Sequence, residues 1–126
     1  MEKNECILSP LPKTWIFDLD GTIVKHNGYL NKGKDSLLDG AKELIASIPE
    51  DDMIIIITSR NEKYRDLTES FLEENKIRYN TIIWGAPFGE RILFNDKKPS
   101  GLVTAIAVNK DRDSPIQFNF TIDNNL

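Results

Sequence analysis

The chain has 126 residues, enough for one domain with a buried core and too few for two domains of ordinary size. Hydrophobic residues make up 40% of it and charged residues 29%, a composition typical of globular proteins and not of disordered chains. The formal net charge of -4 argues against broad electrostatic binding to nucleic acid or to a membrane surface, and it suits a protein that uses a few carboxylates to hold a cation.

The first predicted elements are an extended lead-in, residues 1–13, and a short buried strand. Pro10 and Pro12 disfavour both helix and ladder hydrogen bonds in the lead-in. It contains no apolar segment of signal-peptide length, and the single cysteine, Cys6, excludes an intrachain disulfide, so we expect a cytoplasmic protein. The apolar run at residues 14–17 stops at Asp-Leu-Asp-Gly-Thr, residues 18–22, which predicts a strand followed by a functional loop.

A loop, a helix and a second strand are predicted next. Residues 28–35 are polar and contain glycine, which indicates a loop. Apolar residues at helical spacing from Leu37 to Ile48, with Asp35 or Ser36 as the cap and Pro49 as the stop, predict a helix. Residues 53–57, a methionine and four isoleucines, have the length and β-branching of a strand covered on both faces, as in a parallel sheet.

The rest of the chain continues the alternation of helices and strands. A helix is predicted from a cap at Asn61 to Asn75, and a strand within residues 77–84 with its core at 81–84. Further strands are predicted at 91–94, 102–108 and 116–122, the last of them a candidate edge strand. Such alternation predicts a small α/β domain, residues 1–126, with a mostly parallel sheet.

Polar residues follow three of the predicted strands: Asp18 to Thr22, Thr58 to Arg60, and Asn95 to Lys98. Because ligands bind outside the carboxyl ends of parallel strands, we expect these residues to surround one site. Three carboxylates with hydroxyls and cations suit Mg²⁺ and a phosphate group. Asp and Gly could instead mark only a turn, but the two other polar strand ends favour a site.

The segment Phe17-Asp-Leu-Asp-Gly-Thr22 after an apolar strand resembles the first motif of the haloacid dehalogenase-like (HAD) phosphohydrolase superfamily. Thr58 and Asp96, each closing an apolar run, resemble the second and fourth motifs, and the likeness extends from about Thr14 to Val108. The resemblance implies a Rossmann-like three-layer α/β/α core with a mostly parallel sheet. Neither gap between motifs holds a cap domain, which needs about 50 residues or more, so we expect a capless member with an open site. It is similar, more loosely, to small bacterial members associated with capsule and surface-polysaccharide synthesis.

This resemblance implies a Mg²⁺-dependent phosphomonoester hydrolase. Asp18 would attack the phosphoryl group, and Asp20 would protonate the leaving alcohol and then activate water. Mg²⁺ would be held by the Asp18 carboxylate, the backbone carbonyl of Asp20 and the Asp96 carboxylate, and Thr58 would hydrogen-bond the phosphate. The further phosphate- or substrate-binding candidates are Gly21, Thr22, Ser59, Arg60 and Lys98. Arg60 could equally pair with a nearby acid of its own helix, Glu62 or Asp66.

Two positions depart from the family pattern. The lysine of the third motif is replaced by Ala86, and we rank Lys97 first, Lys98 second and Arg91 third as its substitutes. The acidic pair of the fourth motif reads Asn95-Asp96, one carboxylate fewer. The leading hypothesis is therefore a phosphatase for a phosphorylated small molecule such as a sugar phosphate, with a second subunit of a homo-oligomer as one means of covering the open site. The main alternative is a catalytically impaired binding or regulatory domain, and a phospho-accepting signalling domain is disfavoured.

Overall fold

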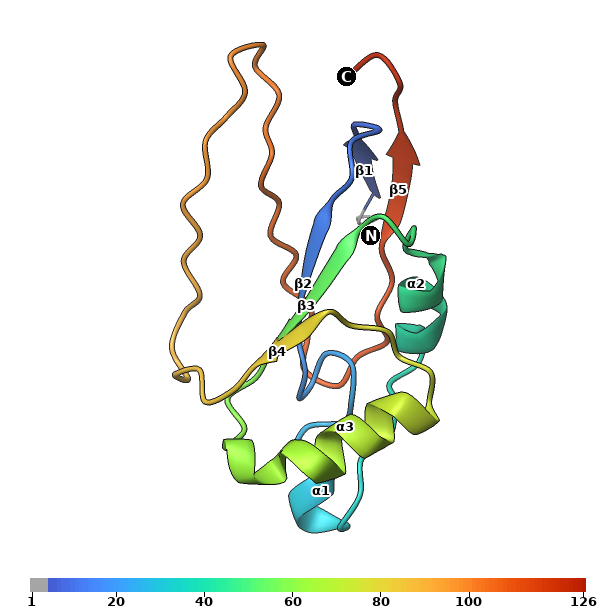
Figure 1. Cartoon of the computed structure of the whole chain (residues 1–126), viewed down its shortest axis with the longest axis vertical. Coiled ribbons are helices and arrows are strands. Elements are labelled where there is room, and N and C mark those ends of the chain that lie inside the picture. The colour runs from blue at the N-terminus through green and yellow to red at the C-terminus, as the bar shows by residue number, and fades with distance from the viewer. Residues whose placement is uncertain (1–4) are drawn as a thin grey trace.

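Three parallel strands form the sheet that carries the first polar loop (Figure 1). The computed structural model describes residues 5–126. Strand β2 spans Thr14–Asp18, β3 spans Met53–Ile57 and β4 spans Thr81–Ile83, in the spatial order β2-β3-β4. The register pairs Asp18 with Ile57 and Ile57 with Ile83, so the carboxyl ends of the three strands lie together. All three predicted strands are confirmed, and the chain is an α/β protein with mostly parallel strands.

A second sheet joins the two ends of the described chain. Strand β1, Glu5–Leu8, pairs in parallel with β5, Asn119–Ile122. The late strand predicted at 116–122 is therefore confirmed in its second half, whereas the lead-in contains a strand that was not predicted. Trp15 of β2 contacts both Phe118 and Phe120, with ring centroids 5.7 and 5.6 Å apart, and these aromatic contacts link the two sheets.

The helices differ from the prediction in two places. A four-residue helix, α1, Gly28–Asn31, lies within the predicted loop, and α2, Ala41–Ser47, starts later than predicted. Gly40 sets the late start, because its φ of 86° is left-handed and the helix can begin only after it. A Cβ at this position would lie 2.2 Å from the carbonyl oxygen of Ile116, so the position requires glycine. Pro49 lies beyond the end of α2 as predicted.

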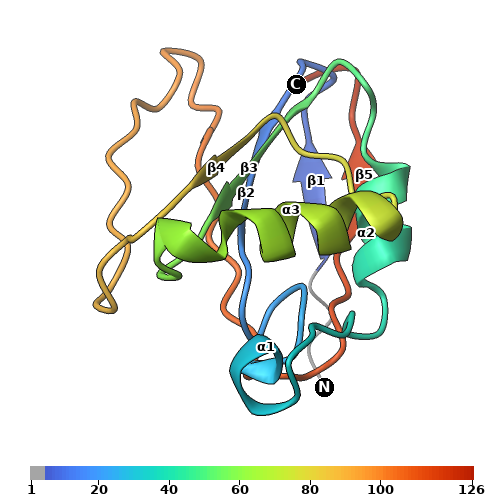
Figure 2. The same ribbon diagram turned by 60° about the horizontal axis from the view of Figure 1, so that its bottom comes forward.

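The helix predicted from Asn61 to Asn75 is confirmed. It consists of a 3₁₀ turn, η1, Glu62–Tyr64, followed by α3, Arg65–Glu74. The Asn61 side chain accepts a hydrogen bond from the backbone N–H of Lys63 at 2.9 Å, and Asn75 is the C-terminal cap. Figure 2 shows α3 crossing one face of the β2-β3-β4 sheet.

The core lies between this sheet and the helices. Its members are Phe17, Leu19, Ile23, Val24, Ala41, Ile45, Ile48, Ile54, Ile56, Leu72 and Ile77. Along β3, Ile54 and Ile56 are fully buried, but Ile55 and Ile57 are only half-buried. The prediction that this strand is covered on both faces is therefore wrong for the second face.

Residues 85–110 form a long excursion that leaves β4 and returns, and its middle part stands apart from both sheets (Figure 1). The strands predicted at 91–94 and 102–108 are wrong, because neither segment joins a ladder. Phe88 and Phe94 are 93% and 92% exposed. The β-branched and aromatic residues here have the local preference for a strand, but no neighbouring strand supplies the hydrogen bonds and the buried face that a sheet requires. None of the helices described within residues 5–126 has the length and apolar character needed to cross a membrane.

Candidate functional site

A tight turn after β2 positions the two acids of the first polar loop. The carbonyl oxygen of Leu19 accepts hydrogen bonds from the backbone N–H groups of Thr22, Ile23 and Val24, at 3.2, 2.9 and 3.1 Å. Gly21 permits the turn with a φ of 83°. The Leu19 side chain is buried in the core, whereas Asp18 and Asp20 on either side of it remain partly exposed. The alternation therefore directs both acids away from the core.

Asp18 lies at the carboxyl end of β2 with its side chain 38% exposed. One carboxylate oxygen accepts a hydrogen bond from the Thr22 hydroxyl at 3.1 Å. The other accepts one from Nη1 of Arg91 at 2.9 Å. Arg91, ranked third among the substitutes for the missing lysine, is thus the cation that contacts the predicted nucleophile.

Asp20 is held by Arg60, which is buried. The Arg60 side chain is 1% exposed and forms ion pairs with Asp20 at 2.9 Å and with Asp35 at 2.6 Å. It also donates to the hydroxyl of Thr68 at 2.8 Å, and its guanidinium lies 3.8 Å from the centre of the Tyr29 ring. Burial alone would lower the pKa of Arg60, but the hydrogen bonds to the two carboxylates outweigh it and raise the pKa above its usual range. Arg60 therefore stays charged inside this network.

The pKa of Tyr29 is shifted by burial and by its place beside Arg60 and Asp20. Burial raises the pKa of the Tyr29 phenol, and the negative charge of Asp20 raises it further. The Tyr29 ring also packs edge-on against Tyr64, with centroids 4.9 Å apart. The Tyr29 ring therefore extends from α1 to Tyr64, just before α3, and packs on the Arg60 guanidinium that binds Asp20.

A second cation reaches the turn from residues 110–114. Nζ of Lys110 donates to the carbonyl oxygen of Gly21 at 2.8 Å, and the backbone N–H of Asp113 donates to the same oxygen at 3.0 Å. The carboxylate of Asp113 in turn accepts from the backbone N–H of His26 at 2.8 Å. Burial lowers the pKa of Lys110, while the negative charges of Asp113, Asp111 and Asp18 oppose that shift.

Lys110 and Asp113 were not predicted as site residues. The segment Asp111-Arg112-Asp113 reads as a solvated turn, and no local pattern marks it as a neighbour of residue 21. Asp35 was missed as well, since it was considered only as a helix cap. All three are brought to the site by tertiary contacts alone.

Thr58 and Ser59 follow β3 and adjoin the same edge. Thr58 is buried, and its backbone N–H donates to Ile83 of β4 at 2.9 Å. Its hydroxyl oxygen accepts from the backbone N–H of Arg60 at 3.1 Å. Because Asp18, the predicted nucleophile, pairs with Ile57 at the end of β3, Thr58 and Ser59 follow directly beside it. The carboxyl ends of β2 and β3 thus meet as predicted.

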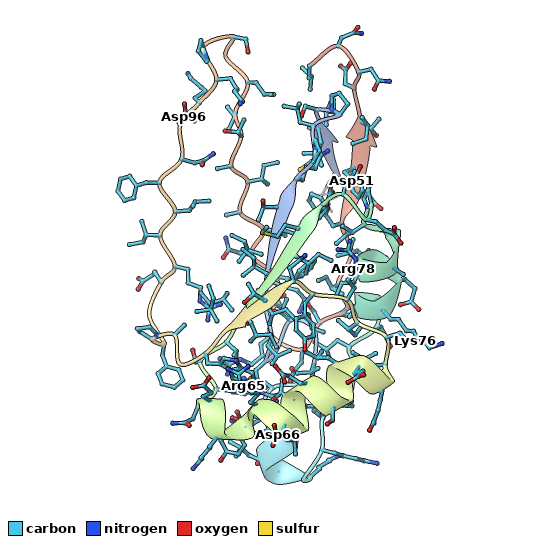
Figure 3. The ribbon with its side chains drawn as sticks, in the orientation of Figure 1. Asp51, Arg65, Asp66, Lys76, Arg78 and Asp96 are labelled. Carbon is cyan, nitrogen blue, oxygen red and sulfur yellow. The ribbon has the colours of Figure 1, made fainter. Side chains whose placement is uncertain are left out.

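The third predicted strand end does not meet them. Figure 3 shows Asp96 on the excursion, far from Arg65 and Asp66 at the start of α3. Lys97 and Lys98 share the exposed excursion, and the backbone carbonyl of Asp96 accepts from the hydroxyl of Thr104 at 2.7 Å. The placement of Asp96, Lys97 and Lys98 therefore differs from the prediction. The strand predicted at 91–94, which would have placed them at the edge of the sheet, does not form because it has no partner strand.

The residues present do not fit a Mg²⁺ site built from three acids. No cluster of three or more His, Cys, Asp or Glu able to hold a metal ion occurs in the part of the chain from residue 5 onwards. Both Asp20 oxygens are engaged by Arg60, and one Asp18 oxygen is engaged by Arg91. What the site does offer is a half-exposed carboxylate flanked by a hydroxyl and two cations.

Comparison of the chain with protein-family models, with curated proteins and with solved structures finds no match. The interpretation of the site depends on its geometry and on the motif in residues 17–22.

Proposed function

We propose that the chain is a phosphomonoester hydrolase of the HAD type that works through an aspartyl-phosphate on Asp18. The observation that carries the proposal is the environment of Asp18: a partly exposed carboxylate at the end of a parallel strand, bonded to a hydroxyl and a guanidinium. A nucleophile needs exposure on one side and fixed orientation on the other, and Asp18 has both. The Asp-Leu-Asp-Gly-Thr motif supports the same reading.

The reaction needs two steps. In the first, an Asp18 oxygen attacks phosphorus, the bond from phosphorus to the alcohol oxygen breaks, and Asp20 in its acid form gives that oxygen a proton. In the second, Asp20 as a carboxylate takes a proton from water while the water oxygen attacks phosphorus. The bond from phosphorus to Asp18 breaks, and inorganic phosphate leaves. Each proton lost by Asp20 in the first step is regained in the second.

Arg91 and Lys110 replace the third-motif lysine in this proposal. Arg91 contacts Asp18 directly, and Lys110 contacts the carbonyl oxygen of the neighbouring Gly21. A bound phosphoryl group would bring more negative charge than the Asp18 carboxylate alone, so Arg91 would pair with the phosphoryl oxygens as well. Lys97 ranks below both residues, because it adjoins Asp96 on the part of the excursion that lies far from the start of α3 (Figure 3).

The finer parts of the proposal come from the family resemblance. They are a three-layer Rossmann-like core without a cap, a phosphorylated small molecule such as a sugar phosphate of surface-polysaccharide synthesis, a cytoplasmic location, and a second subunit over the open site. Mg²⁺ stays the predicted cofactor, and the Asp18 carboxylate and the Asp20 carbonyl are the ligands that the resemblance implies on this turn. No step above is routed through the ion.

The test is hydrolysis of p-nitrophenyl phosphate and of a panel of sugar phosphates, with Mg²⁺ and with EDTA. Asp18→Asn is compared with Asp51→Asn, which changes an exposed acid just before the amino end of β3, far from Arg65 and Asp66 (Figure 3). We expect release of phosphate by the wild type and by Asp51→Asn but not by Asp18→Asn. Equal release by all three proteins would contradict the proposal.

One observation favours a second candidate, a phosphate-binding domain without turnover. Arg60 occupies both oxygens of Asp20, the predicted acid and base, and Ala86 and Asn95 stand where the family has a lysine and an acid. Such a domain would bind inorganic phosphate or a phosphate ester, measured by calorimetry, and would release nothing. Binding without any hydrolysis would favour this candidate over the enzyme.

A further inference from the structure

The Arg60 guanidinium has no hydrogen-bond donor left for a substrate. A guanidinium carries five N–H groups, and all five are used. Nε and Nη2 donate to the two oxygens of Asp20 at 3.0 and 2.9 Å, Nη1 and Nη2 donate to those of Asp35 at 3.0 and 2.6 Å, and Nη1 also donates to Thr68 at 2.8 Å. The predicted role of Arg60 in binding substrate anions would require breaking this network.

We propose instead that Arg60 is a positioning residue, which orients the Asp20 carboxylate for proton transfer and ties it to the segment from Gly28 to Asp35. This inference rests on the proposed function, since it assigns Asp20 the acid and base role. It changes the role of Arg60 from contact with substrate to control of a residue that contacts substrate.

The orientation comes from a two-point contact. Because Nε and Nη2 each hold a different oxygen of Asp20, the plane of the carboxylate cannot rotate about its last bond without losing a charge-assisted hydrogen bond. Each oxygen keeps a second lone pair for a proton. The Asp20 side chain is 18% exposed, so part of it still faces solvent and an incoming leaving group.

The same guanidinium fixes the neighbouring segment. The Asp35 side chain is 1% exposed and accepts two hydrogen bonds from Arg60, and the Tyr29 ring covers the guanidinium from α1. Removal of the guanidinium would leave Asp35 buried without a partner and the Tyr29 ring without its cation. Arg60 therefore links the segment 28–35 directly to Asp20.

The first test compares leaving groups. A phenolate such as p-nitrophenolate leaves without much help from an acid, whereas an alkoxide requires a proton, so misplacement of Asp20 should slow phosphoryl transfer from an alkyl substrate more than from an aryl one. For Arg60→Lys, which keeps the charge and loses the fork, we expect the ratio of kcat/KM for an alkyl phosphate to kcat/KM for p-nitrophenyl phosphate to fall about tenfold, because kcat/KM reports the step in which the leaving group departs. In an Asp20→Asn background the same substitution should leave the ratio unchanged.

Arg65→Lys is the matched control, because Arg65 is also paired with two acids but does not contact Asp20. A raised KM with equal loss on both substrates would make Arg60 a binding residue and overturn the inference. An unchanged ratio would overturn it too. Failure of the wild type to hydrolyse either substrate would overturn the proposed function and, with it, the role of Arg60 in proton transfer.

The second test needs no activity. Amide hydrogen exchange should become faster in peptides covering 19–36 when Arg60 is changed to Lys, while peptides of β3 stay protected. Asp35→Asn, which keeps the shape and removes one charge, is the second variant should Arg60→Lys not fold, and it should accelerate exchange in the same peptides. Unchanged exchange in 28–36 in a folded variant would overturn the tie between Arg60 and this segment.

Discussion

The two ends of the β2-β3-β4 sheet use polar residues in different ways. At the amino end, buried Asp52 accepts from the backbone N–H of Lys13 and from the Trp15 indole N–H, both at 3.0 Å. Arg78 donates to three backbone carbonyls there, and Asn80 accepts from the backbone N–H of Ile54 at 2.7 Å. At the carboxyl end, Asp18 and Asp20 bind mainly other charged or hydroxyl side chains.

The difference separates structural from functional polar groups. A side chain that completes backbone hydrogen bonds removes a desolvation penalty and adds to stability. A partly exposed carboxylate such as Asp18, paired with a partly exposed arginine, gains little stability from the ion pair, and its partner can be exchanged for a ligand. Substitutions at the amino end should therefore change stability and leave activity alone, and those around Asp18 should do the reverse.

The largest effect is expected for Asp18→Asn. Loss of the nucleophile should lower kcat by at least about 10³-fold, as for other enzymes that form a covalent intermediate. Because Asp18 is partly exposed, the midpoint of urea denaturation should move little. If Asp18→Asn kept a tenth of the wild-type kcat, the claim that the carboxyl end of the sheet holds the nucleophile would be contradicted.

Arg60 lies at the carboxyl end but is buried, so its removal should affect stability as well. Arg60→Met leaves Asp20 and Asp35 close together without their shared cation, and the free energy of unfolding should fall by about 3 kcal/mol. Urea denaturation measures this. Arg65→Met, which removes a more exposed guanidinium, serves as the control and should change stability little. A similar fall in the free energy of unfolding for Arg60→Met and Arg65→Met would contradict the claim that burial makes the Arg60 ion pairs more important for stability.

Asp52→Ala tests the amino end. It leaves the Lys13 N–H and the Trp15 indole without their acceptor, and the free energy of unfolding should fall by about 2 kcal/mol. Hydrolysis at a temperature where the variant is folded should match the wild type. Asp51→Ala, at the exposed neighbouring position, should alter neither quantity. A clear loss of kcat in folded Asp52→Ala would contradict the claim that polar residues at the amino end affect stability and not activity.

The smallest effect is expected among the cations near Asp18. Arg91→Ala should raise KM for a phosphorylated substrate by about tenfold, the loss of one charge-assisted contact. Lys97→Ala is the matched comparison, since Lys97 adjoins Asp96 on the distant part of the excursion and was ranked above Arg91 from sequence (Figure 3). Steady-state kinetics of the two variants decide between them. A larger effect at Lys97 would favour the sequence-based ranking over the placement seen in the structure.

Local signals in the sequence were sufficient for the central part of the fold. Four consecutive isoleucines predict β3, and Asn61 and Asn75 bound a helix because their side chains or conformations suit helix ends. The motif in residues 17–22 located Asp18, Asp20 and Thr22 on one turn, which the structure shows. Each of these inferences needs only residues that are close in sequence.

The remaining features depend on contacts between distant residues. The pairing of β1 with β5 joins the two ends of the chain, and the ion pair of Arg91 with Asp18 spans 73 positions. The segment 91–94 has the composition of a strand, yet a strand forms only with a partner. Asp35 was predicted as a helix cap, but α2 begins only after Gly40, and Asp35 instead pairs with Arg60.

The most direct test of the central claim is to trap the covalent intermediate. The chain is quenched during turnover of a phosphorylated substrate, treated with borohydride, which reduces an aspartyl-phosphate to homoserine, and digested for mass spectrometry. The account predicts homoserine at position 18 in the wild type and at no position in Asp18→Asn. Turnover with Asp18 unmodified, or homoserine at another acid, would contradict it.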